Sequence, residues 1–143
     1  NLSDKKAITQ CAFKGVQIQS GMFDVYSSLL SIPLSTFFGV HEENNQDITS
    51  HALTSGIFAL ENLRLVRYSI AQNLLAIAQA VDLLGGPKLL SSRTQPVYKF
   101  IRERTTYVEE ERPLSREIET LYQSIQNGEL MKFVREKVFK DFV

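Results

Sequence analysis

Seven polar residues stand together at positions 41–47, in the run HEENNQD. They comprise three carboxylates, three carboxamides and one imidazole, and a long stretch with helical apolar spacing follows them at once. Such side chains at the mouth of a helix can line a substrate pocket. A solvated loop in which Asp47 or Thr49 caps the following helix explains the same pattern. The residues alone leave both interpretations open.

A second candidate is Lys14, which lies between Phe13 and Gly15 in an otherwise apolar stretch. Its ammonium group could face a ligand. A lysine whose stem lies along the helix while its charge stays in water is the commoner reason for this pattern. Pattern alone therefore favours a surface lysine at this position.

Other kinds of chemistry find less support. The two histidines, His41 and His51, are ten residues apart and belong to no set with metal-ligand spacing, so we expect no metal site. Nothing places a base beside the single cysteine, Cys11, which we expect to be a buried thiol on a helix face. No glycine-rich phosphate loop is present.

Two long helices are expected to position these residues. Apolar side chains recur at three- and four-residue steps over residues 4–31, and Pro33 ends that pattern. A second such pattern runs from about residue 49 to 84, before the Gly-Gly-Pro stop at 85–87. A helix of about 35 residues is roughly 50 Å long, which exceeds the ~30 Å of a small domain. We therefore expect partner subunits or a larger parent domain to cover it.

Shorter helices are expected beyond this stop. One has Thr94 as its N-cap and Pro96 in its first turn, and another runs from an N-cap at Ser115 to Gly128. Residues 129–141 fit an amphipathic terminal helix. No strand pattern or repeat stands out, so the predicted class is all-α: a long-helix bundle segment with shorter C-terminal helices, part of a larger helical oligomer.

The run IRERTTYVEEERPLSRE at 101–117 is dense in charges of mixed sign. This pattern is typical of a solvated face with local ion pairs, each worth about 0–1 kcal/mol.

Length and composition limit the function classes. The 143 residues make one domain-sized segment, with 43% hydrophobic and 22% charged residues, so a buried core is expected. Lys plus Arg and Asp plus Glu both number 16, which argues against nucleic acid or a membrane as partner. No apolar run approaches the roughly 20 residues of a membrane span. A single cysteine suits a reducing compartment, and we expect a cytoplasmic protein. Because the first residue is Asn1, we expect a piece of a longer chain.

Four segments carry a recognisable pattern: FKGVQIQ at 13–19, IPLSTFFGVHEENNQDITSHAL at 32–53, AIAQAVDLL at 76–84 and VYKFIRERTTYVEEERPLSREIETL at 97–121. They resemble the C-terminal part of the aromatic amino acid ammonia-lyases, the family of phenylalanine, tyrosine and histidine ammonia-lyases and related aminomutases. The resemblance covers nearly the whole chain in the same order. Lys-Gly followed about thirty residues later by Glu-x-x-Asn-Gln-Asp, before a long helix, is its most specific feature.

The resemblance implies an enzyme that removes ammonia from an aromatic amino acid and leaves a trans-2,3-unsaturated acid. The family's electrophile is 4-methylideneimidazole-5-one, made autocatalytically from Ala-Ser-Gly, and no metal is implied. This sequence contains no Ala-Ser-Gly, and Thr54-Ser55-Gly56 falls inside the predicted long helix. The family's catalytic tyrosines and carboxylate-binding arginine also lie upstream of the matched part. We therefore expect these 143 residues to be inactive alone.

The resemblance also implies roles for five residues. Glu42 and Gln46 are the expected catalytic residues, Glu42 at the amine end of the substrate and Gln46 beside the prosthetic group. Lys14, Glu42 and Asn45 are expected to bind the substrate, and Ile18 to line the pocket of its ring. The polar run would then grip a zwitterion at a helix mouth, where dipoles and charges act with little water.

The substrate and assembly follow from the same resemblance. Histidine-type enzymes tend to carry Gln-Glu-Asp-His where this chain has residues 45–48, Asn-Gln-Asp-Ile, and they lack the lysine at Lys14. These departures favour phenylalanine or tyrosine, whereas the tail is most like bacterial histidine-type enzymes. Aminomutases share the same residues. The family's long helices imply a homotetramer, and a non-catalytic helical oligomerisation module is the alternative for the isolated chain.

Overall fold

The structure is a computed structural model that describes residues 6, 8–37, 39, 43 and 50–139. Every regular element in this part of the chain is helical, which confirms the all-α prediction. The helices are α2 (Phe13–Leu30), α3 (Ala52–Leu84), α4 (Gln95–Arg102), α5 (Ser115–Gln126) and α6 (Glu129–Lys137), with short 3-10 turns η1 (Leu34–Thr36) and η3 (Pro87–Leu89). No described helix is long and apolar enough to cross a membrane.

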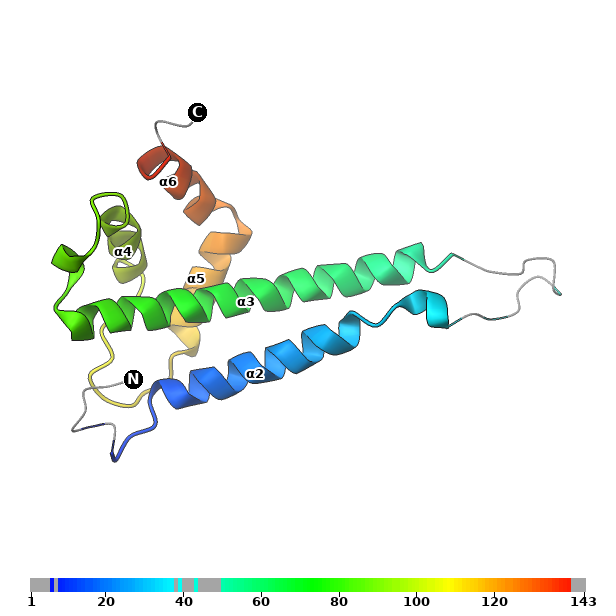
Figure 1. Cartoon of the computed structure of the whole chain (residues 1–143), viewed down its shortest axis with the longest axis horizontal. Coiled ribbons are helices and arrows are strands. Elements are labelled where there is room, and N and C mark those ends of the chain that lie inside the picture. The colour runs from blue at the N-terminus through cyan, green and yellow to red at the C-terminus, as the bar shows by residue number, and fades with distance from the viewer. Residues whose placement is uncertain (1–5, 7, 38, 40–42, 44–49, 140–143) are drawn as a thin grey trace.

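Helices α2 and α3 run side by side in opposite directions, and we call this pair the hairpin (Figure 1). The three shorter helices gather around the C-terminal half of α3, so the two long helices extend beyond them as an arm (Figure 1). The 33 residues of α3 give a length of about 50 Å at 1.5 Å per residue, as the sequence predicted.

The hydrophobic core is confined to that end of the hairpin. It joins one buried α2 residue to the C-terminal half of α3, to α4 and α5, and to the connection between them. Its buried members are Phe13, Ala71, Leu75, Ala78, Ile101, Val108, Leu114, Ile118, Leu121 and Tyr122. The first buried residue of α3 is Leu65, more than three turns from the start of the helix.

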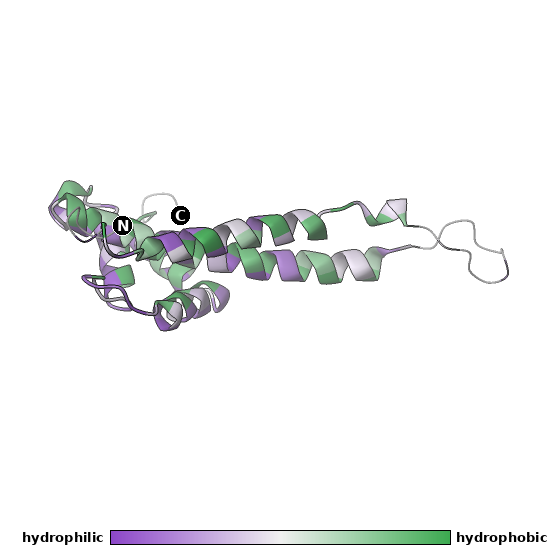
Figure 2. Cartoon of the chain, turned by 90° about the horizontal axis from the view of Figure 1, so that it is seen from below, coloured by the Kyte–Doolittle hydropathy of each residue, from purple (hydrophilic) through white to green (hydrophobic). Residues whose placement is uncertain are grey.

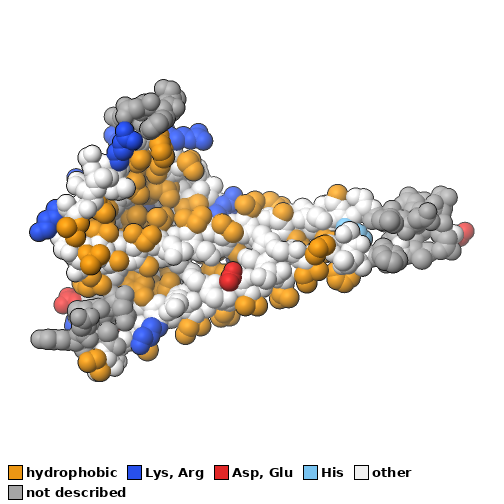
Figure 3. Space-filling view, viewed as in Figure 1, with side chains coloured by type: hydrophobic (Ala, Val, Ile, Leu, Met, Phe, Trp, Pro, Cys, Tyr) orange, Lys and Arg blue, Asp and Glu red, His pale blue; other side chains and the backbone are white. Residues whose placement is uncertain are grey.

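The arm carries many exposed apolar side chains. Along α3 they recur at three- and four-residue steps: Leu53, Ile57, Leu60, Leu63 and Val66. Hydrophobic colouring continues along both long helices beyond the shorter ones (Figure 2), and apolar side chains lie on the surface of the arm (Figure 3). Nothing in the described part of the chain covers them.

The first predicted helix begins later than its apolar spacing indicated. The prediction of one helix over residues 4–31 is wrong at its start, because α2 begins only at Phe13. The preceding segment is held instead by the distant connection 103–114: the backbone N–H of Cys11 donates to Glu111 Oε2 (3.3 Å), and the Glu111 N–H donates to Gln10 Oε1 (2.9 Å). Cys11 is exposed, so the prediction of a buried thiol is also wrong.

Helix ends followed local stereochemistry more closely than helix starts. Gly85 and Gly86 have φ of +120° and +89° and stop α3, as predicted. The α3 N-cap is His51, not Asp47 or Thr49, and the α5 N-cap is Leu114, not Ser115. Neither N-cap makes a side-chain capping bond.

Two further predictions concern the start of α4 and the end of α6. Thr94 is the N-cap residue of α4, as predicted, but its hydroxyl donates to the Ser91 carbonyl at 3.2 Å and makes no capping bond to the helix. The terminal helix α6 forms but ends at Lys137 rather than at residue 141.

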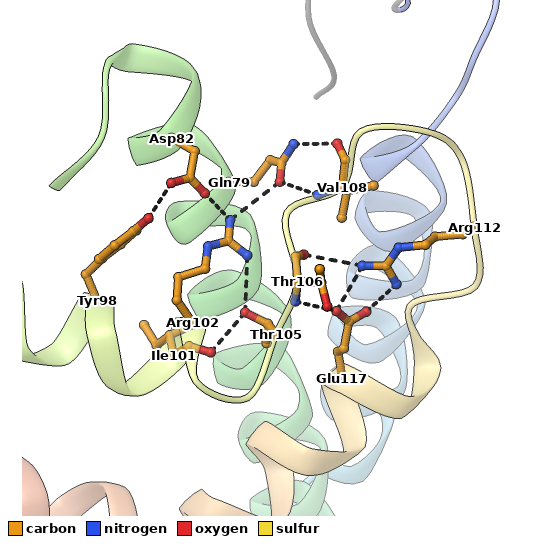
Figure 4. A network of polar contacts seen from close by, with 10 residues as sticks. All are labelled: Gln79, Asp82, Tyr98, Ile101, Arg102, Thr105, Thr106, Val108, Arg112 and Glu117. Atoms are coloured by element: carbon orange, nitrogen blue, oxygen red, sulfur yellow. Dashed lines mark hydrogen bonds and ion pairs between the residues drawn. The ribbon is translucent and has the colours of Figure 1, made fainter.

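A polar network holds the connection 103–114 and α4 against the end of α3 (Figure 4). Gln79 bonds the backbone of Val108, and Arg102 bonds the Thr105 hydroxyl (3.2 Å) and the Asp82 carboxylate. Asp82 also accepts a hydrogen bond from the Tyr98 hydroxyl. The prediction that the charged run 101–117 forms a solvated face with local pairs is therefore wrong for Arg102. Its partner lies 20 residues away, and its side chain is only 14% exposed.

Candidate functional site

Lys14 lies in the first turn of α2, where it borders an open groove of about 460 Å³ between the two hairpin helices. The residue is exposed. The groove is lined from α2 by Phe13, Lys14, Val16, Gln17 and Ser20, and from α3 by Gln72, Asn73 and Ala76. It therefore combines an ammonium group, carboxamides and a hydroxyl with apolar walls, a lining suited to a ligand that has both a charged and an apolar part.

Ile18 lies one turn further along α2 and is 68% exposed. It borders a shallow apolar trough on the outer side of the helix, together with Gly21, Met22, Val25, Tyr26 and Leu29. Because residues four apart share a helix face, Lys14 and Ile18 point to neighbouring directions. The structure thus brings a charged residue to one end of an apolar strip.

The other predicted site residues, Glu42, Asn45 and Gln46, lie outside the described residues. The 3-10 turn η1 and the start of α3, between which they fall in the sequence, lie at the end of the hairpin remote from the shorter helices (Figure 1). Lys14 lies at the opposite end of α2, whose 18 residues span about 27 Å.

The sequence did not identify Gln72, which has the most specific contacts between α2 and α3. Its side chain is 1% exposed. Its Nε2 donates to Gln19 Oε1, and its Oε1 accepts from the Ser20 hydroxyl, both at 2.6 Å. The available signal was a pair of glutamines, Gln72 and Gln79, seven residues apart on one face of the predicted long helix.

Metal chemistry finds no support in the part of the chain that the structure describes, where no three His, Cys, Asp or Glu side chains gather as a metal site requires. The triplet Thr54-Ser55-Gly56 lies in the first turns of α3, as predicted. The Ser55 N–H donates to the His51 carbonyl at 2.9 Å, a helical hydrogen bond.

Comparison with known proteins decides the family. A profile described as aromatic amino acid lyase matches residues 1–103. The chain belongs to the aromatic amino acid lyase family. It is 28% identical to a tyrosine ammonia-lyase of Cupriavidus metallidurans over 87% of its length. It is 34% identical to a histidine ammonia-lyase of Symbiobacterium thermophilum over 76% of its length.

A solved family structure shares the fold. The crystal structure of tyrosine aminomutase from Streptomyces globisporus matches 88% of this chain with a TM-score of 0.80 and 26% identity. The chain spans 24% of that structure, and 24% and 20% of the two ammonia-lyases. The described helices are therefore similar to about a quarter of a larger family member.

Proposed function

We propose that this chain forms part of the substrate pocket and helical bundle of an ammonia-lyase that acts on phenylalanine or tyrosine. The product would be the corresponding trans-2,3-unsaturated acid. The observation that carries this proposal is the arrangement on α2, where Lys14 borders a mixed polar and apolar groove and Ile18 faces outward one turn away. In a chain of this family, that arrangement suits an aromatic amino acid, which has a charged end and an apolar ring.

The proposed roles follow from the chemistry of the side chains. Ile18 contacts the ring, where burial of apolar surface favours binding. Lys14 and Glu42 act on the charged groups of the substrate, and Asn45 and Gln46 supply hydrogen bonds beside them. These interactions strengthen when the pocket closes and water leaves, because the local dielectric constant falls.

We further propose that the protein uses 4-methylideneimidazole-5-one, with Gln46 as its neighbour in this chain. When bound, this group supplies the electrophile that the elimination requires. Its Ala-Ser-Gly precursor does not occur in the 143 residues. Thr54-Ser55-Gly56 does not fit that role, since it lacks the alanine and its serine is held in regular helix. The prosthetic group would therefore come from residues outside this sequence.

The arm supports the proposal that the protein is a homotetramer. Exposed apolar residues at helical spacing along α3 indicate a surface that another helix covers. Lys14 lies at one end of α2, and the residues that flank the polar run lie beyond the other end. We therefore propose that Lys14 and Glu42 of one pocket come from different copies of the protein.

Two other functions have specific support. The similarity to a histidine ammonia-lyase favours histidine as substrate, and the similarity to a tyrosine aminomutase favours transfer of the amino group instead of its loss. An isolated chain of 143 residues would act only as a helical oligomerisation module.

The test is an ultraviolet assay of the intact natural protein, offered phenylalanine, tyrosine and histidine separately. Formation of the conjugated acid is followed in the wild type and in Glu42→Gln and Lys14→Met. We expect each substitution to lower kcat/KM about tenfold or more, which corresponds to about 1.4 kcal/mol of transition-state stabilisation. Lys99→Met, which removes an exposed lysine of α4, is the matched control and should leave kcat/KM within about twofold.

Each other outcome has a definite meaning. Turnover of histidine alone would contradict the role given to Lys14. A β-amino acid product would identify an aminomutase. Absence of the prosthetic group from the intact protein would leave the helical module as the function.

A further inference from the structure

The contact between the two hairpin helices depends on one buried carboxamide. Gln72 of α3 is 1% exposed, and both of its polar atoms are used: Nε2 donates to Gln19 Oε1 and Oε1 accepts from Ser20 Oγ, each at 2.6 Å. Gln19 and Ser20 are consecutive residues of α2, so both hydrogen bonds of the amide hold the same short stretch of that helix. We call these three residues the amide clasp.

Other contacts between the hairpin helices are looser: the ring centroids of Phe23 and Tyr68 lie 6.0 Å apart, and Asn62 Nδ2 donates to Ser31 Oγ at 3.5 Å. Phe13 is the one buried residue of α2, and a Cβ atom added to Gly15 or Gly21 would meet nothing within 4 Å. Apolar contacts are non-directional, so they permit a helix to rotate or slide by a fraction of a turn. Hydrogen bonds are directional, and an unpaired amide in this buried position would be unfavourable. The amide clasp therefore sets the rotation of α2 about its own axis.

This rotation decides where the predicted substrate residues point. Ile18 directly precedes Gln19, and Lys14 borders the same groove as Ser20 and Gln72. Each residue turns a helix by 100°, so a slip by one residue would move both side chains to another face. We propose that Gln72 is a positioning residue, which acts through the amide clasp to aim Lys14 and Ile18 into the substrate pocket. This inference rests on the proposed function.

The test uses the intact protein with Gln72→Met, which keeps a side chain of similar length but removes both hydrogen bonds. Gln79→Met is the matched control, because Gln79 is also 1% exposed on α3 yet bonds Val108 rather than α2. We expect Gln72→Met to lower kcat/KM at least about tenfold, mainly through KM, while Gln79→Met lowers the melting temperature and leaves kcat/KM within about twofold.

A double-mutant cycle separates positioning from general destabilisation. If Gln72 acts through Lys14, adding Gln72→Met to the Lys14→Met variant should lower kcat/KM by less than about threefold. Amide hydrogen exchange should also become faster in α2 of Gln72→Met and remain unchanged there in Gln79→Met.

A second pair of variants covers the case in which Gln72→Met does not fold. Ser20→Ala removes one bond of the clasp, and Ser124→Ala removes a serine of α5 that is 3% exposed and bonds the Thr120 carbonyl. The positioning role would be overturned if the clasp variants and their matched controls lowered kcat/KM equally. It would also be overturned if the losses in kcat/KM from Gln72→Met and Lys14→Met were additive. Faster exchange in α2 of Gln72→Met with unchanged kcat/KM would do so as well. A wild-type protein that turns over none of the three amino acids would refute the proposed function itself, and the positioning role with it.

Discussion

The side-chain amide of Gln79 pairs with both backbone groups of Val108, much as one strand residue pairs with another. The Val108 N–H donates to Gln79 Oε1 at 3.0 Å, and Gln79 Nε2 donates to the Val108 carbonyl at 2.8 Å. Gln79 and Val108 are each 1% exposed. One glutamine side chain of α3 therefore pairs with the buried N–H and carbonyl of Val108, a residue outside the helices.

Replacing Gln79 should destabilise the fold by leaving the Val108 N–H and carbonyl unpaired. Each of these two unsatisfied buried groups costs about 1–3 kcal/mol, so we expect Gln79→Ala to lower the free energy of unfolding by about 2–6 kcal/mol. Urea denaturation followed by circular dichroism measures this change. Gln126→Ala, at an exposed position of α5, should stay within about 0.5 kcal/mol of the wild type. Equal stability of the two variants would show that the Val108 contact contributes nothing.

The free energy of unfolding should depend on pH through the carboxyl group of Glu117. Burial by itself would raise the pKa of this carboxyl, but hydrogen bonds from the Arg112 guanidinium (2.6 and 2.9 Å) and the Thr106 N–H (2.7 Å) outweigh it and lower the pKa. A lowered folded-state pKa means that the stabilisation is complete above the unfolded-state pKa near 4.5 and is lost as the pH falls through the folded-state value.

We expect Glu117→Gln to remove about 1–3 kcal/mol at pH 7 and much less below the folded-state pKa of Glu117. The measurement is the free energy of unfolding of both proteins from pH 7 to pH 3. An equal difference between them at every pH would contradict a contribution from the Glu117 charge.

Glycine is required where α3 stops and is not required inside that helix. Gly86 has φ +89° and ψ −174°, a conformation nearly confined to glycine, whereas Gly56 lies in α3. An added Cβ would meet nothing within 4 Å at either position, so only the backbone conformation differs. We expect Gly86→Ala to destabilise by about 1–3 kcal/mol and Gly56→Ala to stabilise by up to about 1 kcal/mol. Thermal unfolding of the two variants is the measurement, and the same sign for both would contradict this account.

The uncovered strip on α3 predicts an assembly defect. Leu60 is 69% exposed and lies in the middle of the row of exposed apolar side chains on the arm. A charge there would have to be buried in any helix bundle, so Leu60→Glu should shift the intact protein from the proposed tetramer toward smaller species. Analytical ultracentrifugation gives the masses. Gln126→Glu adds the same charge at a polar exposed position and should leave the mass unchanged, and an unchanged mass for Leu60→Glu would place this strip outside the interface.

Local features of the sequence determined the long helix and its end. Apolar spacing without proline predicted a helix from about 49 to 84, and the helix runs from Ala52 to Leu84. The Gly-Gly-Pro stop could be predicted because positive φ and a missing N–H are properties of those residues themselves. The same holds for the helix break near Pro33 and for the N-cap at Thr94. Lys14 stood out as a charge in an apolar stretch, Ile18 was selected through the resemblance to a family, and the roles of both stay predictions.

Only the tertiary structure decided what depends on residues far apart in the chain. The helix beginning expected near residue 4 lies at Phe13, because the preceding segment bonds Glu111, a hundred positions later. Gln72 and Gln79 look alike in the sequence, yet one joins α3 to α2 and the other joins it to the connection 103–114. Arg102 pairs with Asp82 across two elements rather than with its charged neighbours. Which polar groups are buried and paired depends on which elements pack together, and the spacing of residues along one helix does not show which elements do.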